Sequence, residues 1–174
     1  MTPSELLVDA FDRLPPLARE AVEGLDADAL ARRPDPGANT ISWLLWHTAR
    51  GQDVQVADLA GGEQAWTAGG WADRFDLPFD TDEMGYGQDP SEVAAVRATG
   101  DLLVGYLEAV TLRTRAHLER LDGGAYDEVV DDQWDPPVTA GARLVSVLED
   151  CVQHVGQAAY VLSLIHISEP TRPY

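Results

Sequence analysis

The 174-residue chain contains no lysine, one cysteine and only twelve basic residues, all arginine, against thirty acidic residues. Its formal net charge of -18 repels phosphate backbones and anionic lipids, so we expect neither nucleic acid nor a membrane surface as a partner. The lone Cys151 excludes an internal disulfide and a cysteine-rich zinc site. No apolar run reaches about 18 residues, and Met1 leads into a charged amphipathic stretch rather than a signal peptide. These absences predict a cytoplasmic protein without a transmembrane segment.

The length and composition predict one folded domain. Hydrophobic residues make up 45% and charged residues 24% of the chain, which is ordinary for a globular protein. Residues 162–172 resemble the in-frame translation of a transposon-type sequencing adaptor. We therefore expect the domain to cover residues 1–161 and residues 162–174 to be a non-native tail, in which His166 has no function.

Apolar residues recur at three- and four-residue spacings in four long segments, which predicts helices over about 3–23, 40–60, 90–121 and 140–160. The Pro15-Pro16 pair predicts a kink in the first of them, and residues 25–33 a short helix. Residues 61–90 are rich in Gly, Asp and aromatic side chains and show no sustained period. A connection of this length is uncommon unless it covers something, such as the mouth of a site. The pattern predicts an all-α helix bundle with two long loops.

Three side chains on two of these helices form a candidate metal site. His47 lies on the second predicted helix, while Asp150 and His154 are four residues apart on the last, so they share one helical face. Two imidazoles and a carboxylate with an open position describe a divalent metal site that can take water or substrate. Glu149 and Gln153 lie on other faces of that helix and rank below Asp150 as ligands.

Other reactive side chains have simpler interpretations. His117 lies among charged residues, which predicts a solvated position, and Cys151 reads as a small core residue. Tryptophans 66, 71 and 134 lie in the predicted loops and could line a pocket over the metal.

The segment 42–47 (SWLLWH), the WADRF segment at 71–75 and the motif Asp150-x-x-x-His154-x-Gly156-Gln157 together resemble the DinB-like (YfiT-like) superfamily of metalloenzymes. That superfamily includes mycothiol-dependent maleylpyruvate isomerase and bacillithiol transferases. The resemblance implies an up-down-down-up four-helix bundle in which His47, Asp150 and His154 bind a divalent metal. Zn and Ni are the metals that we expect before others. Many members have a histidine where this chain has Asp150, whereas the mycothiol-dependent branch is similar in having an acidic residue there. The arginine bias fits the actinobacterial branches.

This resemblance favours a thiol-dependent S-transferase or isomerase that uses mycothiol and acts on a small electrophile. Arg50 and Arg74 would grip carboxylates on the thiol or the substrate, and Trp71 and Trp134 would line the site. Two alternatives stay open. One is a metal-dependent hydrolase in which a nearby carboxylate such as Asp53 acts as the base, and the other is a non-catalytic metal-binding bundle. A homodimer is compatible with each.

Overall fold

The computed structural model describes residues 1–168, with side chains through residue 165. Its helices are α1 (Pro3–Asp12), α2 (Leu14–Val22), α3 (Ala27–Leu30), α4 (Ile41–Ala60), α5 (Ala65–Ala68), α6 (Trp71–Phe75), α7 (Pro90–Ala95), α8 (Gly100–Leu118) and α9 (Ala140–Ser168). A short 3-10 turn, η1 (Ala125–Asp127), and two strands, β1 (Val129–Asp131) and β2 (Val138–Thr139), precede α9. The prediction of an all-α fold is confirmed.

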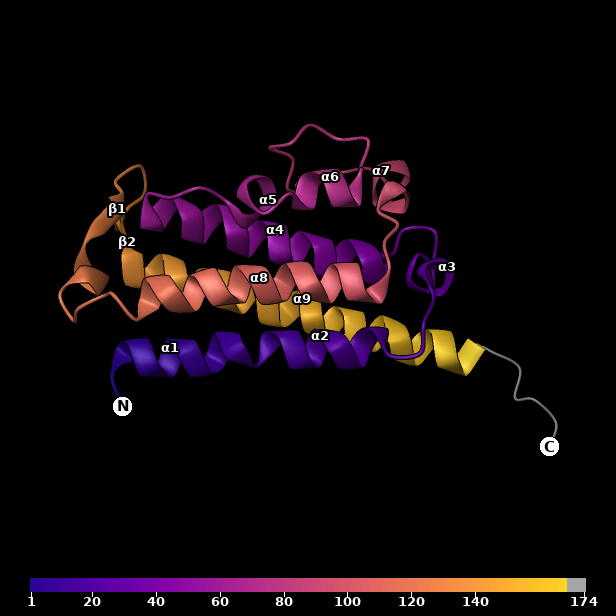
Figure 1. Cartoon of the computed structure of the whole chain (residues 1–174), viewed down its shortest axis with the longest axis horizontal. Coiled ribbons are helices and arrows are strands. Elements are labelled where there is room, and N and C mark those ends of the chain that lie inside the picture. The colour runs from indigo at the N-terminus through magenta and orange to yellow at the C-terminus, as the bar shows by residue number, and fades with distance from the viewer. Residues whose placement is uncertain (169–174) are drawn as a thin grey trace.

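Four long rods lie side by side: α1 followed by α2, then α4, α8 and α9 (Figure 1). The first rod and α9 run in one direction along the bundle, while α4 and α8 run in the other (Figure 1). Helix α4 packs against both α8 and α9, so its side chains are buried on most sides. Among the described residues, no helix is long and apolar enough to cross a membrane.

Local sequence signals fix most helix ends. The Thr2 side chain and Glu5 form a reciprocal capping box at the start of α1, and the Thr40 hydroxyl accepts from the Trp43 N–H at the start of α4. Helix α4 ends at Gly61, whose φ of 59° is left-handed. The expected interruption near Pro15 and Pro16 is present, because α1 ends at Asp12 and α2 begins at Leu14.

The predicted continuous helix over 90–121 is wrong, because the chain forms α7 and then α8. Val96 is extended and buried, and Ala98 is buried beside the break. The Thr99 side chain then caps the new helix by accepting from the Leu102 N–H. Burying these two apolar side chains between the helices outweighs continuation of the helical period, which the sequence pattern alone cannot show.

The two long connections contain more structure than the sequence predicts. The first holds α5 and α6, which pack beside α8. The second holds the antiparallel pair β1–β2, with Val129 opposite Thr139 and Asp131 opposite Val138. Helix α9 also continues past the predicted domain end at residue 161, and the Ile165 side chain lies in the core. The rest of the predicted tail, residues 169–174, and the side chain of His166 lie outside the described residues.

Candidate metal centre

The structure brings His47, Asp150 and His154 together where α4 and α9 pack against each other. One possible ligand atom from each of the three side chains lies within 4.8 Å of the others. The Nε2 atom of His154 is 3.4 Å from Oδ1 of Asp150, and the His47 and His154 rings are 4.9 Å apart between centroids. The triad arises because His47 faces the helical surface on which Asp150 and His154 are one turn apart.

His47 is oriented by the loop that follows α6. Its Nδ1–H donates to the backbone carbonyl of Met84, since a carbonyl oxygen can only accept. Its ring stacks on Trp43 at 4.6 Å, and its side chain is only 3% exposed. Gly85, with a φ of 101°, allows this approach, because a Cβ there would lie 2.9 Å from Nδ1 of His47. The neutral imidazole therefore keeps a lone pair on Nε2.

His154 is held in the same way by a different partner. Its Nδ1–H donates to the side-chain oxygen of Gln157 at 2.9 Å, which leaves Nε2 facing Asp150. A hydrogen bond from the far ring nitrogen to a protein acceptor is the arrangement that orients metal-binding histidines. Both imidazoles of the triad thus have Nδ1 engaged and Nε2 available.

The three groups shift one another's protonation. When His154 is protonated, its Nε2–H donates to the Asp150 carboxylate. This hydrogen bond raises the pKa of His154 and lowers the pKa of Asp150. Burial lowers the pKa of His47, although its bond to Met84 and the charge of Asp150 oppose this. Without an ion, the site therefore holds an ionised carboxylate, a neutral His47 and a His154 that retains its proton more readily than usual.

These donors fit a divalent ion. Two imidazole nitrogens and one carboxylate oxygen suit first-row metals such as Zn and Ni, and three protein ligands leave coordination positions free. The side chains of His154 and Asp150 are 17% and 42% exposed, so the triad is reachable from solvent.

A hollow of about 400 Å³ opens beside Asp150. Gly51 and Gln55 of α4 form one wall, and Tyr86 of the loop and Trp134 of the second connection lie at its mouth. A Cβ on Gly51 would come 3.8 Å from the Asp150 carboxylate, so this side chain lies directly against α4. The prediction that the long connection covers a site therefore agrees with the position of residues 84–86.

Arg50 does not reach the triad. Its side chain is fully buried and donates to the carbonyls of Glu83 and Thr81 and to the side chain of Gln64. Its guanidinium also lies over the Trp66 ring, 4.9 Å from the centroid. The structure therefore gives Arg50 the role of holding the connection 61–89 against α4, not of gripping a substrate.

Asp53 likewise has its hydrogen-bond partners outside the triad. Its two carboxylate oxygens accept from the backbone N–H groups of Ala65 and Trp66 and from the Tyr106 hydroxyl, all within 2.8 Å. Both carboxylate oxygens are therefore engaged, two of the bonds fixing the start of α5 and the third reaching α8. Asp53, which the hydrolase alternative offered as an example of a base, is thus engaged by groups outside the triad.

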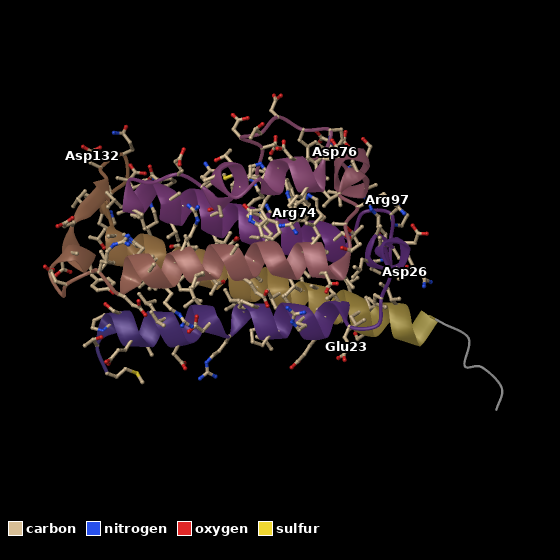
Figure 2. All side chains as sticks on the ribbon, viewed as in Figure 1. Glu23, Asp26, Arg74, Asp76, Arg97 and Asp132 are labelled. Atoms are coloured by element: carbon tan, nitrogen blue, oxygen red, sulfur yellow. The ribbon has the colours of Figure 1, made fainter. Side chains whose placement is uncertain are left out.

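Two of the remaining candidates also lie elsewhere. Trp71 is buried against Tyr106 and Gly105 of α8, and Arg74 is exposed and stacks on Trp71 at 3.9 Å. Figure 2 shows Arg74 on the α6 side of the bundle, away from the hairpin end that Asp132 marks. Trp134, by contrast, lines the hollow. Of the four predicted binding residues, only Trp134 lies beside the triad.

The structure also places the remaining side chains that the sequence analysis considered, and one of these predictions is wrong. Cys151 is buried as a core residue, where burial raises the pKa of its thiol. Glu149 and Gln153 are exposed and bond to each other on the outer face of α9. His117 was expected in solvent but is only 8% exposed, because the end of α8 packs against the N-terminal rod.

Sequence reasoning missed Tyr86, Arg143 and the partner carbonyl of Met84. The signal for Arg143 was available, because it lies seven residues before Asp150 and so on the same helical face. Tyr86 lies between two glycines of positive φ, Gly85 and Gly87. Such glycines indicate an exposed turn, but they do not show that the turn packs beside the triad.

Comparison with known proteins agrees with this fold. The sequence profile of the DinB superfamily matches residues 10–158, so the chain belongs to the DinB superfamily. A crystal structure described as a conserved protein from Enterococcus faecalis superposes with a TM-score of 0.90. It is 31% identical in sequence, and the match covers 97% of this chain and 99% of that one. No curated protein matches the sequence.

Proposed function

We propose that the chain is a divalent-metal-dependent enzyme that uses a low-molecular-weight thiol such as mycothiol as an S-transferase or isomerase on a small electrophile. The observation that carries this proposal is the paired orientation of His47 and His154, each with Nδ1 engaged by an acceptor and Nε2 left available beside Asp150. A solvent-exposed hollow next to these donors gives room for organic ligands.

The triad would hold Zn or Ni, and such an ion lowers the pKa of a bound thiol so that it stays a thiolate at neutral pH. Side chains and one backbone carbonyl of the protein orient the ligands and line the site. Met84 and Gln157 fix the two imidazoles, Trp43 keeps one face of His47 dry, and Tyr86 and Trp134 offer aromatic surfaces to the ligand. A cytoplasmic location and a homodimer remain predictions from the sequence.

The first test is metal content. Protein purified without an affinity tag and reconstituted with zinc should hold about one ion per chain, and His47→Ala should abolish it. His117→Ala is the matched control, because it removes a second buried histidine that lies outside the triad. Equal zinc content in all three proteins would refute the site.

The second test addresses the thiol. Cobalt-substituted protein titrated with mycothiol should develop a thiolate-to-cobalt charge-transfer band in the near ultraviolet, and apo protein should not. A full complement of cobalt with no spectral change for mycothiol or other cellular thiols would refute thiol chemistry while leaving the metal site in place.

A further inference from the structure

Arg143 is the only cationic side chain that the structure describes around the hollow beside the triad. The other charged groups lining this cavity are the carboxylates of Asp131 and Asp150. The chain carries a net charge of -18. An arginine that lines a cavity therefore gives this cavity a local positive charge, which most of the surface lacks.

The Arg143 guanidinium has donors to spare. Its Nη1 donates to Oδ2 of Asp58 at 2.8 Å, while its Nη2 is 3.7 Å from Oδ2 of Asp131, too far for a hydrogen bond. The Asp58 side chain is 70% exposed, so that ion pair is weak. The planar fork of N–H groups can therefore donate hydrogen bonds to a second oxyanion within the hollow.

The register of α9 connects Arg143 to the triad. Arg143 and Asp150 are seven residues apart, which places them on one face of the helix with roughly 10 Å of rise between them. Ser146 and Val147 lie between them on this face and also line the hollow. A ligand of small-molecule length can therefore contact Arg143 at one end and the triad at the other.

The walls of the hollow suit a small organic anion. Its volume of about 400 Å³ falls within the roughly 300–1,000 Å³ of small-molecule sites. Tyr86 and Trp134 at the mouth are 62% and 67% exposed, so two large aromatic faces lie uncovered beside the arginine.

We propose that Arg143 determines specificity by anchoring a carboxylate of the small ligand whose reactive end lies at the triad. A singly charged carboxylate fits better than a phosphate, because Asp131 and Asp150 repel a second negative charge. This rests on the proposed function, since that function places the reacting end of the ligand at His47, Asp150 and His154. The carboxylate can belong to the thiol or to the electrophile.

Two matched pairs of probes separate these sources. N-Acetylcysteine and N-acetylcysteamine are thiols that differ in a carboxylate, and crotonate and crotonamide are electrophiles in which a carboxylate replaces an amide. Binding of each to the zinc-loaded protein is measured by calorimetry. In the pair that the site recognises, the carboxylate form should bind about tenfold more tightly.

Three variants test the role of Arg143. In Arg143→Gln, the ratio of the affinities for the carboxylate probe and its neutral counterpart should fall to about one, and the zinc content should stay unchanged. Asp131→Asn should increase the preference, because it removes the competing carboxylate and its amide oxygen can still accept from the Gln133 N–H. Asp58→Asn breaks the ion pair on the outer side of Arg143 and should leave the preference intact.

A preference that survives in Arg143→Gln, or that is absent from both pairs in the wild type, would overturn the proposal. If Arg143→Gln does not fold, Asp131→Asn decides: a stronger preference supports the proposal and an unchanged one overturns it. Failure of the thiol chemistry has a different signature. In that case thiols leave the cobalt spectrum unchanged, whereas an Arg143-dependent preference for crotonate persists.

Discussion

Gln157 fixes the ring of His154 through the side-chain oxygen that accepts from Nδ1–H. Removing that acceptor frees the imidazole to rotate and lowers its basicity, so Gln157→Leu should weaken zinc binding by about tenfold. Competition with a chromogenic chelator measures the affinity. Gln153→Leu makes the same change on the outer face of α9, where the side chain bonds only to Glu149, and should bind zinc like the wild type. Equal losses in both variants would contradict the orienting role.

His117 makes the stability of the metal-free protein depend on pH. Burial, assisted by the nearby Arg120, lowers the pKa of His117 in the folded state. The unfolded chain therefore binds its proton first, and stability present above the ordinary pKa of about 6.5 is lost as the pH falls through the folded-state value.

Urea unfolding between pH 8 and pH 5 tests this effect. His117→Gln should lose less stability over this range than the wild type, because its side chain does not titrate. The comparison with the wild type cancels the contributions of His47 and His154, whose pKa values shift in opposite directions. Parallel curves for the two proteins would contradict the prediction.

At the scale of elements, the loop at Gly85 holds part of the candidate metal centre in place. Gly85→Ala and Gly87→Ala each put a side chain at positive φ, which costs about 1–3 kcal/mol of stability. Only at Gly85 does the new Cβ meet His47, whereas nothing lies within 4 Å at Gly87. Zinc affinity should therefore fall in Gly85→Ala and stay near wild type in Gly87→Ala. An equal change in both would show that backbone strain alone disturbs the site.

The connection 61–89 is attached to α4 by the buried pair Arg50 and Asp53. Asp53→Asn removes the charge opposite Arg50 and turns an amide donor toward N–H groups that need an acceptor. We expect a loss of about 3 kcal/mol in the free energy of unfolding, measured by urea titration. Asp58→Asn breaks an exposed ion pair on the same helix and should cost less than about 1 kcal/mol. Similar losses for both would contradict the role of Asp53 as an anchor.

At the scale of the whole molecule, the net charge of -18 makes the folded state repel itself. Salt shortens the screening length from about 30 Å at 0.01 M to about 8 Å at 0.15 M, so the melting temperature should rise by several degrees over this range. Scanning calorimetry in sodium chloride and in potassium chloride measures it, and both salts should act alike. A melting temperature that falls with salt would mean that attractive ion pairs outweigh the general repulsion.

Much of the fold followed from local pattern. The spacing of apolar residues predicted the four rods, and the Pro15-Pro16 pair marked the real interruption between α1 and α2. The break between α7 and α8 was missed because Val96 and Ala98 gain burial only from neighbours that are distant in sequence.

The sequence by itself determined the helical class, the family motifs and the shared face of Asp150 and His154, because these depend on residues a few positions apart. Tertiary structure decided what surrounds them. It brought His47 to the pair, buried Arg50 and Asp53 as anchors, and placed Tyr86, Trp134 and Arg143 around one hollow. Which way a long polar side chain points depends on its nearest partners in space, and those partners come from other segments of the chain.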